Sequence, residues 1–402
     1  MCFSPSSSSF VASSSIHRAI TAAIVLPATL VAASAFARVP PPDVTARSWV
    51  LVDATSNQVL ASGNQDERSE PASLTKLMTA YLVFDALKSK KINMDETVMP
   101  SKAVRRVGTD ESRMFIEANK PVTVHDLVYG MIIQSGNDAA IALAELVGDS
   151  ESNFVSLMNA AAKQIGMENT HFADVNGMSD PQHYTTAGDL AVLSTRLIRD
   201  FPEYYSIFSV KDFTYNKIKQ PNRNRLLWID STVDGLKTGH TQAAGYCLIA
   251  TAKRPRDGVP DASRLVAVMM GEPKEHNRVQ DSLKMLNYGY TAYDTLRLYK
   301  AGQVIESPRV YKGTENLVQA GVETDHYITV PKGMGDKVKP TVTYNDTIVA
   351  PIKKGQQIGT VKMMADGKEV AQFPLVALQD VPQAGFVGRT WDSLLMMWQK
   401  KK

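Results

Sequence analysis

Ser73 and Lys76, which could act as a nucleophile and its base, lie three positions apart in the stretch SEPASLTKLMTAYLVFDAL, residues 69–87. Pro71 suits a first helical turn, because its missing N–H would have no partner there. The apolar residues that follow have the i, i+3, i+4, i+7, i+8 spacing of a buried helix face: Leu74, Leu77, Met78, Tyr81 and Leu82. A lysine can activate a serine hydroxyl only if burial or a nearby cation lowers the lysine pKa toward neutrality. We therefore predict a helix that places Ser73 near its positive end and Lys76 on the same side.

Ser-x-x-Lys alone is a weak signal, but two further motifs accompany it. Ser135-Gly136-Asn137 stands where an apolar run meets a helical pattern, and Lys237-Thr238-Gly239 stands at the start of a predicted strand. The three motifs in this order form the set found in penicillin-binding proteins and serine β-lactamases. Together they indicate acyl transfer through a serine.

The chain resembles the low-molecular-mass penicillin-binding proteins that are D-alanyl-D-alanine carboxypeptidases, the group with a C-terminal β domain and a membrane-binding terminal helix. The likeness runs from about residue 45 to the C-terminus and includes ASLTKLMTAY, SGNDA, NTHF, NRNRLLW, VDGLKTGHT and AGY. The middle motif is Ser-Gly-Asn, where many β-lactamases have Ser-Asp-Asn, which favours a peptidase. The resemblance implies a transpeptidase-like fold, peptidoglycan stem peptides ending in D-Ala-D-Ala as substrate, β-lactams as covalent inhibitors, and no cofactor.

The resemblance also implies a role for each motif residue. Ser73 attacks the carbonyl of the penultimate D-Ala, Lys76 is the base, and Ser135 passes a proton to the leaving amine. Lys237 adds positive charge that disfavours a proton on Lys76 and attracts the substrate carboxylate. Asn137 is expected to hold the substrate amide and Lys76 together.

The oxyanion hole is expected to use the backbone N–H of Ser73 and that of His240, which follows Gly239 on the substrate-binding strand. Each such donor is typically worth ~3 kcal/mol of barrier. No motif places the glutamate that class A β-lactamases use for deacylation. Lys76 and Ser135 both remain candidates to activate the deacylating water, and slow release of a β-lactam is expected.

The terminal carboxylate of the substrate needs cationic or hydrogen-bonding partners. Thr238 could donate one hydrogen bond. Arg278 in EHNRVQDS matches the carboxylate-binding arginine of the family, and Arg223 in NRNRLLW matches an arginine near Lys-Thr-Gly. A guanidinium suits a carboxylate because it donates two parallel hydrogen bonds. The alternative for each arginine is a surface ion pair.

These groups must be positioned by helices and strands, and the sequence patterns predict a mixed α/β (α+β) domain of the serine β-lactamase/transpeptidase type over residues 38–291. SWVLVDATSNQVLAS predicts two strands around a turn, and GYCLIATAKR and RLVAVMMG predict buried strands joined by a turn-rich segment. Thr186 and Asp189 have capping-box spacing for a helix. Helical periodicity covers three other stretches: 71–88, 124–148 and 151–165.

The last third of the chain predicts two further regions. Residues 292–385 contain short alternating runs separated by turn residues, which predict a small all-β sandwich that acts as a spacer or docking module. Residues 386–402 place Trp391, Leu394, Leu395 and Trp398 on one helix face and end in three lysines. This pattern fits an amphipathic helix that binds the lipids of the inner membrane. The alternative is a helix packed on the β domain.

Residues 1–37 predict a cleaved secretory signal. The uncharged, largely apolar run 19–33 follows Arg18 and precedes an Ala-x-Ala sequence, so cleavage is expected after Ala37. An N-terminal transmembrane anchor is the alternative, although Pro27 interrupts the run. We therefore expect an exported protein attached peripherally to the periplasmic face of a bacterial inner membrane.

Several other classes fit poorly. The net charge of +3 gives no sign of nucleic-acid binding. Cys2 and Cys247 provide no internal disulfide, and Cys247 is expected in the core. A zinc peptidase is disfavoured because the sequence has no His-Glu-x-x-His and no metal-ligand spacing among His125, His171, His183, His276 and His326. The absence of Gly-x-Ser-x-Gly argues against an α/β-hydrolase. A β-lactamase of the same fold and a catalytically idle penicillin-binding scaffold remain as alternatives to the carboxypeptidase.

Overall fold

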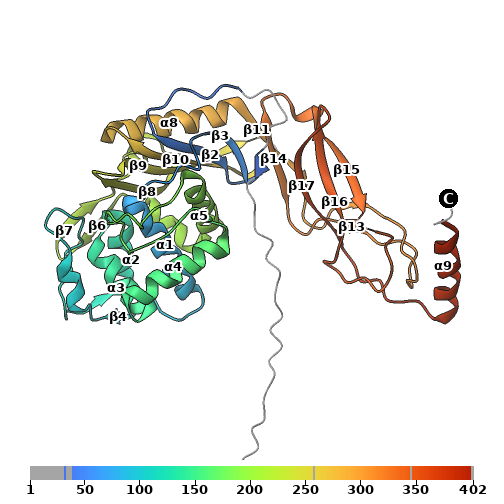
Figure 1. The fold of residues 1–402 in the computed structure, drawn as a ribbon, viewed down its shortest axis with the longest axis horizontal. Helices are drawn as coiled ribbons and strands as arrows, with labels where there is room; N and C mark the ends of the chain where they lie inside the picture. The colour runs from blue at the N-terminus through green and yellow to red at the C-terminus, as the bar shows by residue number, and fades with distance from the viewer. Residues whose placement is uncertain (1–30, 33–38, 257–258, 345, 400–402) are drawn as a thin grey trace, which may run out of the picture.

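The computed structural model describes residues 31–32, 39–256, 259–344 and 346–399. Its first domain is built on one six-stranded sheet with the order β1-β3-β2-β10-β9-β8 (Figure 1). Neighbouring strands are antiparallel except β1, which pairs in parallel with β3. The strands are β1 (Val31–Ala32), β2 (Ser48–Asp53), β3 (Gln58–Gly63), β8 (Val233–Thr241), β9 (Gly245–Arg256) and β10 (Val259–Glu272).

Apolar side chains point alternately to the two faces of this sheet along its central strands, so both faces are buried. Val50 and Val52 of β2 belong to the core beneath the main helical layer, whereas Leu51 belongs to the core shared with α8 (Glu275–Ala292). The helical layer covers the other face (Figure 1). It contains α1 (Lys76–Lys88), α2 (Val124–Tyr129), α3 (Asn137–Gly148), α4 (Glu151–Ile165), α5 (Ala187–Asp200) and α6 (Pro202–Tyr205).

Short elements complete this domain. Two small hairpins pair β4 (Thr97–Val98) with β5 (Val122–Thr123) and β6 (Asp212–Tyr215) with β7 (Ile218–Pro221), and α7 (Leu226–Ile229) precedes β8. The predicted strand pair near residue 50 and the helix capped by Thr186 are confirmed, because the Thr186 side chain accepts a hydrogen bond from the Asp189 N–H at 3.0 Å. Cys247 is fully buried in β9, as expected.

Three predicted elements differ in detail. The 71–88 helix begins with a 3₁₀ turn at Ala72–Thr75. The 124–148 helix is interrupted by a π-helical turn, Gly130–Gln134, and by a left-handed Ser135. The expectation that Lys-Thr-Gly starts a strand is wrong: β8 begins four residues earlier, at Val233. Gly235, a poor strand former alone, pairs with Thr251 of β9, and Asp234 lies at a register shift.

The second domain is all-β. A five-stranded sheet has the order β12-β13-β17-β16-β15, and a separate pair joins β11 to β14. Ile328 and Val330 of β14 share one apolar core with Val361 and Leu375 of the larger sheet. The strands are β11 (Tyr293–Tyr299), β12 (Val304–Glu306), β13 (Ala320–Gly321), β14 (His326–Pro331), β15 (Lys339–Tyr344), β16 (Gln357–Ala365) and β17 (Lys368–Ala377).

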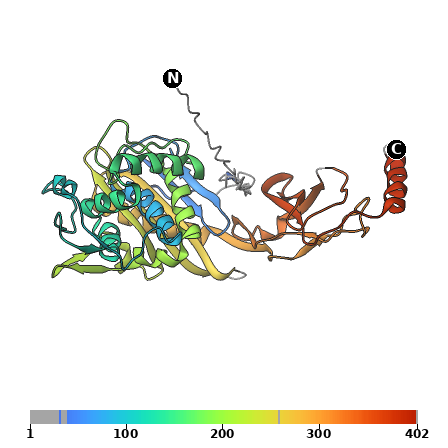
Figure 2. The same ribbon diagram turned by 90° about the horizontal axis from the view of Figure 1, so that it is seen from below.

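Polar side chains join the two domains. Asp53 at the end of β2 accepts hydrogen bonds from the hydroxyls of Thr295, at 2.6 Å, and Thr329, at 2.7 Å. The first domain and the C-terminal helix α9 (Phe386–Gln399) lie at opposite ends of an elongated molecule (Figures 1 and 2). Every helix in the described parts of the chain is too short or too polar to span a bilayer. The predicted signal segment lies outside the described residues, apart from β1.

Candidate active site

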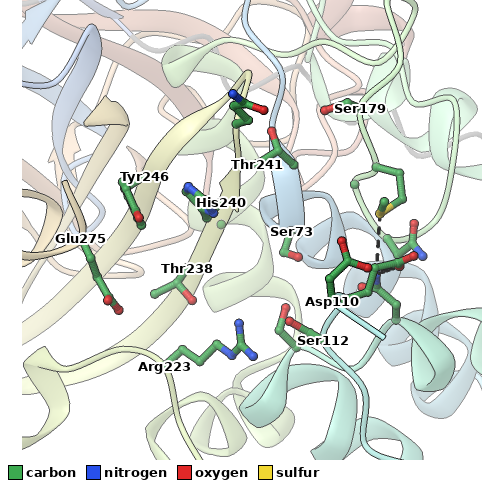
Figure 3. Close-up of a pocket in the computed structure, with 18 of the residues that line it drawn as sticks. Ser73, Asp110, Ser112, Ser179, Arg223, Thr238, His240, Thr241, Tyr246 and Glu275 are labelled. Atoms are coloured by element: carbon green, nitrogen blue, oxygen red, sulfur yellow. Dashed lines mark hydrogen bonds between the residues drawn. The ribbon is translucent and has the colours of Figure 1, made fainter. Parts of the chain in front are cut away.

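A cleft of about 650 Å³ opens between β8 and the helical layer, and all three motifs reach it. Ser73 faces its centre, Arg223 and Thr238 lie on one side, and Asp110 lies on the other (Figure 3). Its lining includes eight of the ten predicted site residues: Ser73, Ser135, Asn137, Arg223, Thr238, Gly239, His240 and Arg278. Lys76 and Lys237 are buried directly behind it and contact Ser73 and Ser135.

The 3₁₀ turn before α1 sets the geometry of the first motif. Lys76 Nζ donates to Ser73 Oγ at 3.0 Å and to the Asn176 carbonyl at 2.6 Å. Ala72, immediately before Ser73, has a left-handed φ of +47°, which is strained for a residue with a Cβ. The predicted contact between serine and lysine is therefore present, on a strained turn.

The environment of Lys76 favours its neutral form. The pKa of Lys76 is lowered from 10.5 to about 7, mainly because the amine is buried. The Asp174 carboxylate acts in the opposite direction, and the positive charge of Arg223 lowers the pKa further. Burial also lowers the pKa of Lys237 well below its usual value. The positive charge of Lys76 is the next largest influence and lowers it further. The expectation that burial and a second cation would together lower the Lys76 pKa is therefore met by burial first and by Arg223 as the cation.

The second motif is held by its unusual backbone. The left-handed Ser135, with φ +66°, directs its hydroxyl to Lys237, whose Nζ donates to Ser135 Oγ at 2.9 Å. Asn137 donates to Glu111 instead of binding Lys76, and in the described structure its Oδ1 has no hydrogen-bond partner. This free acceptor suits a substrate N–H. The bond between Asn137 and Lys76 is not found among the described residues.

The third motif approaches the serine through Gly239. A Cβ at this position would lie 3.2 Å from the Ser73 nitrogen and 3.1 Å from the Pro71 oxygen, so only glycine lets β8 come this close. Because β8 is an edge strand, some of its N–H groups have no strand partner on the outer side. The approach brings the segment that carries His240 next to the Ser73 backbone.

The two arginines have different surroundings. Arg278 is buried, donates to the Gly239 carbonyl at 3.2 Å and to Glu275 at 3.0 Å, and leaves its Nε without a partner in the described structure. Arg223 makes no ion pair within the described residues, and its guanidinium points toward the cleft (Figure 3). Arg278 thus forms an ion pair with the exposed Glu275 while its own side chain is buried, whereas Arg223 forms no ion pair within the described residues.

Sequence reasoning missed several residues of the cleft. Asp110, Glu111 and Ser112 lie on a loop that Asp138 holds by accepting hydrogen bonds from the N–H groups at 114, 115 and 116. Asn176 contributes through its carbonyl, which no side-chain pattern could reveal. The Asp-Glu pair in GTDES was the one visible signal, and it has no periodicity that would place it.

The sheet, the helical layer and the paired serine–lysine contacts define a penicillin-binding serine peptidase with an added β domain. The chain belongs to the D-alanyl-D-alanine carboxypeptidase family, which it matches over residues 35–274, and residues 293–383 match the C-terminal domain of penicillin-binding protein 5. The predicted family, enzyme class and fold class are confirmed.

Individual proteins similar to this chain carry the same family name. The chain is 44% identical to D-alanyl-D-alanine carboxypeptidase DacA of Haemophilus influenzae, over 89% of this chain and 91% of that protein. It is 41% identical to carboxypeptidase DacC of Escherichia coli, over 89% and 90%. The crystal structure of penicillin-binding protein 5 from Haemophilus influenzae superposes with a TM-score of 0.81 at 44% identity, covering 86% of this chain and all of that one.

Proposed function

We propose that this chain releases the terminal D-Ala of peptidoglycan stem peptides through an acyl-enzyme on Ser73, and that β-lactams acylate the same hydroxyl. The observation that carries this proposal is the 3.0 Å contact between Ser73 Oγ and the buried Lys76 amine, whose pKa is about 7. The direct test incubates the purified protein with a D-Ala-D-Ala peptide and measures free D-Ala. A β-lactamase would instead turn penicillin over quickly, and an idle scaffold would release no D-Ala.

In the proposed first step, neutral Lys76 takes the proton of Ser73 as Oγ bonds to the carbonyl carbon. The N–H groups of Ser73 and His240 stabilise the resulting oxyanion. Ser135 then delivers its proton to the departing D-Ala nitrogen as the C–N bond breaks and takes up the proton that Lys76 received, so Lys76 is neutral again; Ser135 Oγ stays hydrogen-bonded to Lys237 Nζ. Water attacks the ester carbonyl in the second step and gives a proton to Lys76 or Ser135. That proton then passes to Ser73 Oγ as the acyl C–O bond breaks.

We assign the terminal carboxylate of the substrate to the side of the cleft formed by Arg223, Thr238 and Arg278. Arg223 supports this assignment because it lines the cleft with no ion-pair partner in the described residues. Asn137 Oδ1 would accept a substrate amide N–H. The cation-rich side would therefore select peptides with a free C-terminus.

Replacing Arg278 with alanine is expected to slow D-Ala release by about 10- to 100-fold, the usual worth of a hydrogen bond to a charged group. Penicillin acylation should slow far less if the peptide carboxylate is the main partner. Both rates are measured by steady-state D-Ala release and by labelled-penicillin trapping. Arg225→Ala is the matched control, since Arg225 is exposed and lies outside the cleft. Equal losses on both substrates would show that Arg278 mainly supports Gly239.

We further propose four segments: a signal peptide at 1–37, the peptidase domain at 38–291, the β domain at 292–385 and a lipid-binding helix at 386–402. The exposure of apolar side chains on α9 supports the last assignment, with Val387 82%, Trp391 65% and Trp398 78% exposed. The opposite face of α9 is attached to the β domain, where Asp392 accepts a hydrogen bond from the Lys312 N–H. This arrangement leaves the tryptophan face free for the periplasmic surface of the inner membrane.

Deleting residues 386–402 should release the mature protein from vesicles that contain anionic lipid, while cleavage of small peptides stays normal. The cleft lies in the other domain, so its geometry does not depend on α9. Vesicle co-sedimentation and D-Ala release measure the two effects. Salt should weaken binding of the intact protein only partly, because apolar contact remains after charges are screened. A truncated protein that stays on vesicles would contradict the assignment of 386–402 as the anchor.

A further inference from the structure

A buried histidine lies directly behind the turn that carries Ser73. The His183 side chain is fully buried, and its ring packs edge-on against Phe172 at 5.7 Å. It does not line the cleft, so it cannot touch a substrate. The three catalytic motifs do not include it.

The hydrogen bonds around His183 indicate which ring nitrogen accepts and which donates. The Ala173 N–H donates to Nδ1 at 3.3 Å, so Nδ1 carries no hydrogen. The proton of a neutral ring is then on Nε2, which lies 2.9 Å from Thr75 Oγ1. The Thr75 hydroxyl in turn donates to the Ala72 carbonyl at 2.8 Å. Each donor in this series of hydrogen bonds is used once. The charged group that faces the ring is the Asp174 carboxylate, 3.5 Å from Nδ1.

At the Thr75 end, this series of hydrogen bonds holds the strained turn before the nucleophile. Ala72 has the left-handed φ of +47°, and its carbonyl accepts the Thr75 hydroxyl. Gly177 packs against the same carbonyl so closely that a Cβ there would lie 1.9 Å from its oxygen. The orientation of this peptide fixes where Ser73 begins, and a strained conformation persists only where its surroundings hold it.

At the Ala173 end, the same series holds the loop that contacts the base, Lys76. Ala173, which donates to His183, precedes Asp174, whose carboxylate accepts the N–H groups of Asn176, at 2.8 Å, and Gly177, at 2.6 Å. The Asn176 carbonyl accepts the 2.6 Å hydrogen bond from Lys76 Nζ. The imidazole therefore links the segment that carries Ser73 to the segment that orients Lys76.

We propose that His183 is a positioning residue which, through Thr75 and Ala173, holds Ser73 and Lys76 in reacting geometry. The inference rests on the proposed acyl-enzyme at Ser73. Its chemical requirement is a side chain that donates to Thr75 at one end and accepts from a backbone N–H at the other. Glutamine meets this requirement, with its NH₂ and carbonyl in place of the two ring nitrogens, whereas leucine fills the volume and meets neither demand.

The test compares the acylation rate at saturating labelled penicillin with the apparent dissociation constant. His183→Leu should lower the rate about tenfold or more, because small misplacements of reacting groups are costly, and should leave the dissociation constant nearly unchanged. His183→Gln should recover most of the rate. Ser194→Ala, which removes a buried hydroxyl bonded within α5, is the control and should match the parent protein.

A second pair keeps the test decisive if His183→Leu does not fold. Thr75→Val removes the hydroxyl and should show the same loss of rate, whereas Thr75→Ser keeps the hydroxyl and should retain it. A parent rate in folded His183→Leu or in Thr75→Val would overturn the inference, as would a glutamine variant as slow as the leucine variant. A parent protein that penicillin never acylates would instead refute the proposed function.

Discussion

Replacing Lys76 with arginine is expected to slow acylation of Ser73 by a factor of about 10² to 10⁴, the usual contribution of general base catalysis. Arginine keeps a positive charge but cannot give up its proton at accessible pH, so it cannot accept one from Ser73. The measurement is the rate at which labelled penicillin becomes covalently attached. Lys88→Arg, on the exposed end of the same helix, is the matched control and should acylate normally.

The Lys76→Arg result has meaning only for folded protein. Lys76 is 2% exposed, so the larger guanidinium must fit a packed site, and a circular dichroism spectrum and thermal unfolding curve should accompany the rates. A folded arginine variant that acylates at the parent rate would assign the base to another group, with Lys237 and Ser135 the nearest alternatives.

The pH dependence of acylation is expected to follow the free amine of Lys76. Its pKa of about 7 lies below the ordinary 10.5 because the group is buried, so the reactive neutral form predominates above pH 7 and is lost as the pH falls. The second-order rate constant for penicillin acylation should rise about tenfold per pH unit below the midpoint and level off above it, a change of roughly 100-fold between pH 5 and pH 8. Arg223 and Arg278 keep their charge over this range, so substrate attraction changes little.

Stopped-flow or quenched acylation in buffers of constant ionic strength measures this profile. Because the rate constant for free enzyme and free penicillin reports groups of the free enzyme, its midpoint can be compared with Lys76 directly. A profile that is flat from pH 5 to pH 8, or one that falls as the pH rises, would contradict a lysine base with a lowered pKa.

Sequence patterns predicted the parts of the site that depend on local spacing. Ser73 and Lys76 meet because three residues make nearly one helical turn, and the Thr186 cap forms because its hydroxyl reaches an N–H three residues later. The order of the three motifs also identified the family. These features need no knowledge of distant contacts.

The remaining features depend on residues far apart in the sequence. Ala72 adopts a left-handed conformation because Thr75 and Gly177 enclose its carbonyl, and alanine itself gives no sign of this. Asn137 donates to Glu111 instead of Lys76 because the loop that carries Glu111 lies beside it. Asn176 acts through its backbone, so its side-chain type carries no information about its role.

The most direct test of the account is to trap the acyl-enzyme with labelled penicillin, digest the protein and locate the label by mass spectrometry. The contact between Ser73 Oγ and Lys76 Nζ predicts one acyl group per chain, on the peptide that contains Ser73, and none on a Ser73→Ala variant. A label on Ser135 or on any other residue, or stoichiometric labelling of Ser73→Ala, would contradict the proposed mechanism.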